Sequence, residues 1–98
     1  MNDKRIADYL AICDTKARYC RALDTKDWDA YADVFTEDLV LDTTPAGGYM
    51  THGRDEALRM IRASLEGARP AHQVHSPEIR FEGDTAAVTW ALQDRVVW

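Results

Sequence analysis

The stretch of sequence that decides the fold is residues 71–98, AHQVHSPEIRFEGDTAAVTWALQDRVVW. Two runs with the residue types of β-strands lie on either side of the tripeptide EGD, which is a hairpin turn signal. We therefore predict an antiparallel pair of strands at about 71–82 and 85–97.

The residues before the hairpin have helical spacing. Apolar residues separated alternately by four and three positions predict an amphipathic helix over about 3–23, with Asp3 as its N-cap. A second, short helix should follow Asp24 or Thr25, either of which can cap it. Its apolar face consists of Trp28, Tyr31 and Phe35.

The middle of the chain contains one predicted strand, one loop and one helix. Residues 39–43 are β-prone, and the proline and two glycines that follow predict a loop. A third helix should begin after Gly53 and end at Gly67. This order of elements defines an α+β fold, in which the helices pack on one face of a curved antiparallel sheet.

Size and composition indicate one folded domain. A chain of 98 residues forms a single core, and its 46% apolar and 30% charged residues are typical of globular proteins. The net charge of −5 disfavours binding to a phosphate backbone, so we expect no nucleic-acid partner. No apolar run is long enough for a membrane span or a secretory signal, so we expect no membrane partner and a cytoplasmic location.

We expect neither a metal nor an organic cofactor. Cys13 and Cys20 lie two helical turns apart, which is too far for a disulfide on one straight helix, and are interpreted as reduced, buried thiols. The chain has no CxxC or HExxH arrangement. It also has no glycine-rich phosphate loop, nucleophile elbow or dinucleotide fingerprint.

Two aspartates are candidates for an interior site. Asp24 continues the apolar stripe of the first helix, so its carboxylate points inward if the helix extends that far; alternatively it caps the second helix. Asp94 interrupts the apolar face that it shares with Trp90 and Leu92 in the last strand. It either lines a cavity, pairs with a neighbouring arginine, or acts as an inward charge that discourages aggregation.

The histidines offer a possible acid–base group. His72 and His75 lie three residues apart on the first hairpin strand, so they face opposite sides unless a bulge near Ser76 and Pro77 intervenes. One of them beside a carboxylate would form a general acid–base pair, whereas a histidine bonded to the backbone is the simpler structural interpretation. His52 lies in a glycine-rich loop and should be solvated.

Three segments, RYCRALDTKDWDAYADVFTEDLVLD (18–42), GRDEALRMI (53–61) and residues 71–98, carry a family resemblance. In order and spacing they resemble the SnoaL-like branch of the nuclear transport factor 2-like superfamily, which includes scytalone dehydratase, bile acid 7α-dehydratase, ketosteroid isomerase and polyketide cyclases. The resemblance implies one domain over residues 1–98. Its fold would be a cone-shaped, curved antiparallel sheet wrapped by three helices, the cystatin-like α+β barrel, around an apolar pocket.

Members of this superfamily usually continue with two more strands after the position of Trp98. We therefore expect a domain that is C-terminally incomplete relative to the family. An uncovered apolar sheet edge promotes association. We expect a homo-oligomer, either a dimer or a trimer.

The resemblance also implies residue roles. It places the acid–histidine pair of the dehydratases on Asp24 and His72, a hydroxyl donor on Tyr19, and a second acid at or next to Asp94. The residues then expected to contact substrate are Trp28, Tyr49, Trp90 and Leu92. The alternative for Trp28, from its helical spacing, is a core position, and tyrosines are more often core residues with a solvated tip.

The implied activity is that of a cofactor-independent dehydratase or isomerase acting on a hydrophobic ring compound, such as a steroid or a polyketide. In this interpretation His72, oriented by Asp24, removes a proton next to a carbonyl group. A non-catalytic ligand-binding or subunit-association domain of the same fold is the alternative. An epoxide hydrolase or cyclase is a third interpretation.

Overall fold

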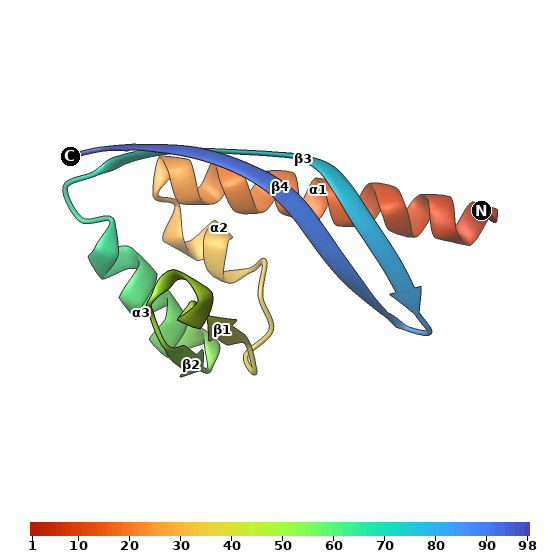
Figure 1. Ribbon diagram of the computed structural model, residues 1–98, viewed down its shortest axis with the longest axis horizontal. Helices are drawn as coiled ribbons and strands as arrows, with labels where there is room; N and C mark the ends of the chain where they lie inside the picture. Colours follow the sequence, from red (N-terminus) through yellow and green to blue (C-terminus); the bar gives the residue numbers. More distant parts are fainter.

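The computed structural model describes residues 1–98 and confirms the predicted α+β class. In chain order its elements are α1 (Asp3–Thr25), α2 (Trp28–Ala32), β1 (Val40–Asp42), the 3-10 turn η1 (Thr44–Ala46), β2 (Met50–His52), α3 (Arg54–Ser64), β3 (Arg69–Glu82) and β4 (Thr85–Val97). Figure 1 shows α1 lying along the β3–β4 hairpin, with α2 against the end of α1, α3 against α2, and the β1–β2 pair against α3. No helix is long and apolar enough to cross a membrane.

The hairpin is antiparallel along its length and contains one bulge. The register shifts between His75 and Glu78, where Ser76 has a positive φ of 52°. Pro77 has no N–H to give to the ladder, and a bulge is one of the few places where a strand accepts proline. A bulge also bends the strand, and the tip of the hairpin turns toward the start of α1 (Figure 1).

The bulge changes which side chains of β3 face inward. One inserted residue shifts the period-two alternation, so even-numbered positions face inward before the bulge and odd-numbered positions after it. The less exposed positions are accordingly Pro70, His72, Val74, Pro77, Ile79 and Phe81. His75 precedes the bulge, so it keeps its position on the face opposite His72 and is exposed.

The expected N-cap of α1 is wrong by one residue. Asn2 caps the helix, and its side-chain oxygen accepts a hydrogen bond from the backbone N–H of Arg5 at 2.8 Å. Asp3 lies in the first turn, where a carboxylate is favourable beside the positive end of the helix dipole.

The prediction that Asp24 or Thr25 caps α2 is also wrong. α1 continues through Thr25 and ends at Lys26, which has a left-handed φ of 57°. Asp27 then caps α2 by accepting a hydrogen bond from the N–H of Ala30 at 3.2 Å. Asp24 is therefore part of the last turn of α1, and its carboxylate is free to bond elsewhere.

The middle of the chain contains a strand that the sequence did not indicate. The strand predicted at 39–43 is β1, and β2 pairs with it antiparallel. β2 has only three residues, of which only Thr51 is buried, so it shows no detectable alternation. α3 ends at Ser64, before the predicted stop at Gly67, and β3 begins two residues earlier than the predicted position 71.

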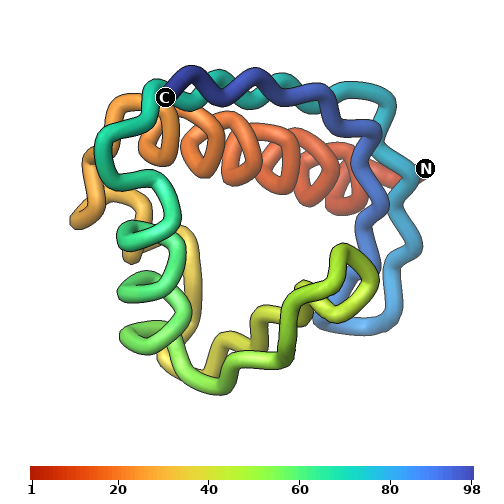
Figure 2. Tube along the Cα trace, turned by 60° about the vertical axis from the view of Figure 1, so that its left-hand side comes forward, coloured from red at the N-terminus to blue at the C-terminus, as the bar shows by residue number.

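The core is small and lies between the end of α1, α2 and α3. Ala22, Leu23 and Tyr31 are its buried members. The ring of Tyr31 lies 5.1 Å from those of both Tyr19 and Phe35, in the tilted and edge-on arrangements that aromatic pairs prefer. Figure 2 shows the chain as an open ring, with α1 and the hairpin along one side and α3 and the β1–β2 pair completing it.

Replacing Tyr31 by phenylalanine is expected to stabilise the protein. The Tyr31 hydroxyl is fully buried without a hydrogen-bond partner, and burial, followed by the neighbouring Tyr19, raises its pKa far above the ordinary value. An unsatisfied buried polar group costs about 1–3 kcal/mol, so Tyr31→Phe should raise the free energy of unfolding by about 1 kcal/mol. Urea unfolding measures this, with Tyr49→Phe at an exposed position as the unchanged control. A loss of stability in Tyr31→Phe would contradict the prediction.

Candidate active site

Asp24 and His72 meet where the end of α1 packs against β3. The backbone N–H of His72 donates to Oδ2 of Asp24 at 2.9 Å, and the imidazole Nδ1 lies 2.7 Å from Oδ1 of the same carboxylate. Both carboxylate oxygens thus bind one residue. This double contact fixes the backbone and the ring of His72 together, which leaves the imidazole little freedom to turn.

The contact with Asp24 also determines which nitrogen of His72 can act as a base. An ionised carboxylate only accepts hydrogen bonds, so Nδ1 must carry the proton in the pair with Asp24. In a neutral imidazole the other nitrogen, Nε2, then holds the free lone pair. The site therefore presents Nε2 as a proton acceptor and holds it in a fixed direction.

Asp94 lies on the other side of the His72 ring. It is the register partner of His72 in the hairpin, and its Oδ2 is 3.8 Å from Nε2. The N–H of His72 points away from β4, toward Asp24, as in the non-hydrogen-bonded pairs of an antiparallel ladder, whose side chains lie closest together. Asp94 is therefore placed to stabilise a proton that arrives on Nε2.

The two carboxylates differ in their surroundings. The side chains of His72 and Asp24 are 14% and 25% exposed, whereas that of Asp94 is 52% exposed. Asp24 lies near the negative end of the α1 dipole, in a last turn without basic residues, a position that costs a carboxylate about 0.3–1 kcal/mol. Its two bonds to His72 offset this cost.

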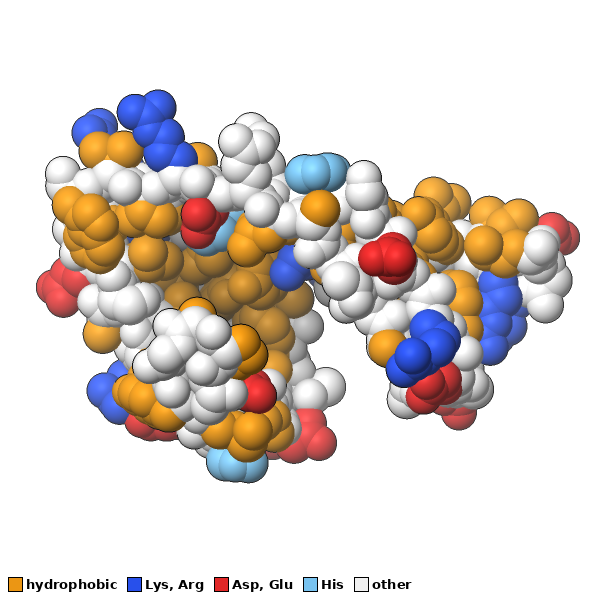
Figure 3. Space-filling model, in the orientation of Figure 1, with side chains coloured by type: hydrophobic (Ala, Val, Ile, Leu, Met, Phe, Trp, Pro, Cys, Tyr) orange, Lys and Arg blue, Asp and Glu red, His pale blue; other side chains and the backbone are white.

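A cavity of about 610 Å³ lies farther along α1 from this group, between the first two-thirds of α1 and the outer half of the hairpin. Its apolar wall is formed by Ile12, Tyr19, Phe35, Phe81, Val88 and Trp90. Asp24, His72 and Asp94 do not line it. The space-filling view in Figure 3 shows the molecule hollowed between the arm formed by the start of α1 with the hairpin tip and the rest of the protein.

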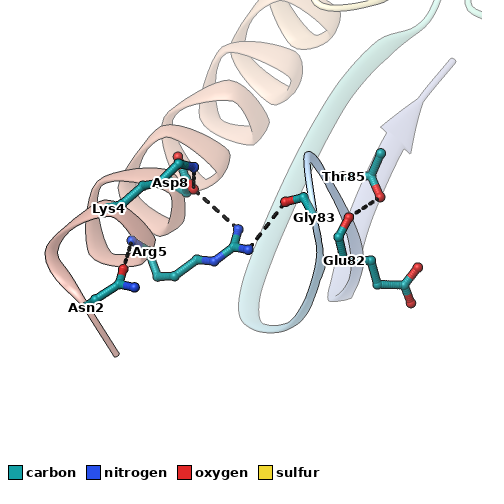
Figure 4. Close-up of polar contacts among 7 residues, drawn as sticks. All are labelled: Asn2, Lys4, Arg5, Asp8, Glu82, Gly83 and Thr85. Carbon is teal, nitrogen blue, oxygen red and sulfur yellow. Dashed lines mark hydrogen bonds and ion pairs between the residues drawn. The ribbon is translucent and has the colours of Figure 1, made fainter.

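Arg5 joins the two walls at the outer end of this cavity. Its guanidinium donates to the carbonyl oxygen of Gly83 in the hairpin turn at 3.3 Å and lies 3.5 Å from Asp8, as Figure 4 shows. The same guanidinium sits 4.5 Å from the ring centroid of Phe81. These contacts hold the tip of the hairpin against the first turns of α1.

The structure does not bring every predicted site residue to His72. Tyr19 and Trp90 line the cavity. Trp28 packs against the core cluster, and Tyr49 and Leu92 are each 61% exposed and lie outside the cavity. Tyr19 and Asp24 point in different directions because α1 is a regular helix as far as Thr25.

No group of three or more His, Cys, Asp or Glu side chains is placed to hold a metal ion.

Lys16, a half-buried cation on the cavity wall, was not among the predicted site residues. Its Nζ lies 3.7 Å from the ring centroid of Tyr19. A signal was available: Lys16 falls on the inner side of the helix, and no acidic residue stands three or four positions away from it.

Solved structures share this fold. A Catenulispora acidiphila protein matches 97% of this chain and 70% of its own, with a TM-score of 0.84 and 23% identity. A Novosphingobium aromaticivorans protein, provisionally named an aromatic ring hydroxylase, matches 94% of this chain and 66% of its own, with a TM-score of 0.84 and 32% identity. A Nostoc punctiforme protein of unknown function with a cystatin-like fold matches 90% of this chain and 65% of its own, with a TM-score of 0.76 and 23% identity.

These matches define the class as cystatin-like α+β proteins, and this chain spans about two thirds of the length of the three structures. The sequence profile of the SnoaL-like domain matches residues 4–98. The chain therefore belongs to the SnoaL-like domain family, which confirms the resemblance seen in the sequence.

The neutral ring of His72 is expected to carry its proton on Nδ1, because Asp24 accepts from that nitrogen. Long-range ¹H–¹⁵N NMR spectra, recorded where the rings are neutral, distinguish the two tautomers. Asp24→Ala should shift His72 toward the Nε2–H form and leave His52 and His75 unchanged. A wild-type His72 that carries its proton mainly on Nε2 would contradict the assigned geometry.

Proposed function

We propose that this chain is a cofactor-independent dehydratase or isomerase that acts by acid–base chemistry on a hydrophobic ring compound, steroid-like or polyketide-like. The observation that carries the proposal is the double contact of one Asp24 carboxylate with His72, which holds the ring and leaves Nε2 as the base. General acid–base catalysis needs a positioned side chain that can take up and return a proton, and histidine serves this role most often.

The proposed reaction begins at a carbon next to the carbonyl group of the substrate. Nε2 of His72 takes a proton from this carbon, and the electron pair of the broken C–H bond forms an enolate. The imidazolium is stabilised by Asp24 at Nδ1 and by Asp94 near Nε2. In a dehydration the carbonyl re-forms as the β-hydroxyl leaves, taking the proton from Nε2–H as water; in an isomerisation the proton returns to another carbon.

The cavity supports a ring compound as the substrate class. Its volume of about 610 Å³ lies within the range of about 300–1,000 Å³ that is usual for small-molecule sites, and its apolar wall includes the rings of Tyr19, Phe35, Phe81 and Trp90. Tyr19 stands on this wall five residues before Asp24 on the same helix. We propose that its hydroxyl donates a hydrogen bond to a substrate oxygen, and that Trp90 contacts the rings.

A non-catalytic ligand-binding or subunit-association domain is the second candidate function. It is favoured by the observation that the cavity is lined by none of Asp24, His72 and Asp94. It is also favoured by the two-stranded sheet, whose long outer edges have no strand partner, and by the exposed apolar side chain of Leu92 in β4. A wild-type chain that binds tetralones but neither dehydrates them nor exchanges their α-protons would support this candidate.

The catalytic proposal is tested with 3-hydroxy-1-tetralone, which loses water to give 1-naphthol, a fluorescent product. His72→Gln and Asp24→Asn should each lower the rate of naphthol formation about 10²–10⁴-fold, which is the usual contribution of a general base. His75→Gln is the matched control, since His75 lies on the opposite face, and should keep the wild-type rate. Wild-type rates in both site variants would contradict the proposal.

We also infer that the chain associates into a dimer or a trimer, because an unpaired strand edge of this length favours pairing with another chain. Light scattering on a size-exclusion column measures the mass directly. Leu92→Lys, which replaces an exposed apolar side chain of β4 by a charged one, should shift the protein toward the monomer. A wild-type monomer at micromolar concentration would contradict this inference.

A further inference from the structure

We propose that Lys16 is an anion-binding residue of the cavity between α1 and the hairpin, and that the ligand of this cavity is an apolar ring compound bearing a carboxylate or another anionic oxygen. This inference rests on the proposed function and deepens it, because it names a chemical group of the substrate class. It concerns binding and orientation, whereas His72 and Asp24 carry the proposed chemistry.

The first support is that Lys16 has no partner in the protein. Its ammonium makes no hydrogen bond to a protein acceptor, and no carboxylate lies within 4.0 Å of it. The side chains three and four positions away along α1 are Ile12, Cys13, Tyr19 and Cys20, none of which is acidic. Its ammonium lies 3.7 Å from the centroid of the Tyr19 ring, over the face of that ring.

The second support is the contrast with the other cations on the cavity wall. Lys4 lies 2.8 Å from Asp8, and Arg5 lies 3.5 Å from the same carboxylate. Those two cations neutralise Asp8, and Arg5 also reaches the hairpin turn at Gly83 (Figure 4). Asp84 is the other acid on the wall and lies in that turn. Lys16 is the unpaired cation nearest the aromatic wall.

The third support is the cost of leaving this ammonium alone. Burial lowers the pKa of Lys16 below its ordinary value, an effect that Cys20 partly opposes. A cation partly removed from water gains from hydrogen bonds to an acceptor, and the Tyr19 ring attracts the ammonium but offers it no acceptor lone pair. An anionic oxygen of a ligand would supply the missing acceptor.

The position of Lys16 also predicts how the ligand lies. Lys16 and Asp24 are eight residues apart on one regular helix, which corresponds to about 12 Å along its axis. An anionic group bound at Lys16 therefore belongs at the end of the molecule remote from the carbon that meets His72. Lys16 would act as an orienting residue for a ligand with two or more fused rings.

The test compares two ligands of the same shape that differ in charge, 2-naphthoate and 2-naphthamide. Isothermal titration calorimetry at pH 7 and low salt gives the Kd of each for the 98-residue chain. Wild type should bind the acid about tenfold or more tightly than the amide, as expected for a charge-assisted hydrogen bond in a partly desolvated site. Lys16→Met should remove this preference, and Lys16→Arg should retain it.

Lys4→Met is the matched control, because Lys4 is on the same cavity wall but is exposed and already paired with Asp8. It should leave the preference for the acid unchanged. Equal affinity of wild type for both ligands, binding of neither, or an unchanged preference in Lys16→Met with wild-type circular dichroism would overturn the inference. Asp24→Asn separates it from the proposed function, since this variant should lose tetralone dehydration and keep naphthoate binding.

Discussion

The contact between the Asp24 carboxylate and both the backbone and the ring of His72 is the interaction on which the rest of the site depends. It joins the last turn of a helix to a strand that has no neighbour on that side. Without this contact each group would be unfavourably placed. The Asp24 carboxylate lies near the negative end of the α1 dipole, and the N–H of His72 on the outer edge of β3 has no carbonyl of a neighbouring strand to accept its hydrogen bond. Paired, they leave Nε2 of His72 as the one free nitrogen of the ring.

The rest of the fold determines where Nε2 of His72 points and which side chains lie near it. The bulge after His75 reverses the inward-facing positions of β3, so His72 near one end and Phe81 near the other both face the inner side. The same bend carries the hairpin tip to the start of α1, where Arg5 holds it (Figure 4). The apolar cavity therefore lies beside the earlier turns of α1, and the Asp24–His72 pair lies at the end of this helix. A ligand long enough to extend from the cavity to His72 would be oriented by Lys16.

Much of this arrangement could be predicted from the sequence where a pattern is periodic. The stripe of α1 placed the Asp24 carboxylate inward if the helix extends that far, which it does, whereas the alternation in β4 left Asp94 with both a cavity position and structural alternatives. The hairpin boundaries were nearly right because the turn signal is strong. The cap of α2 could not be predicted, because Asp24 and Asp27 are the same residue type and only the end of α1 distinguishes them. β2 is too short to show a period, and the position of Lys16 on a cavity wall depends on the bend of the hairpin.

The central claim is that Asp24 and His72 act as one catalytic unit. It is tested most directly by a double-mutant cycle on deuterium exchange at C2 of 1-tetralone in D₂O, followed by proton NMR in wild type, Asp24→Asn, His72→Gln and the double variant. Residues that act as a unit are strongly non-additive. The account predicts that the double variant is no slower than His72→Gln alone. Losses that multiply in the double variant would show that the two side chains act independently, and would contradict it.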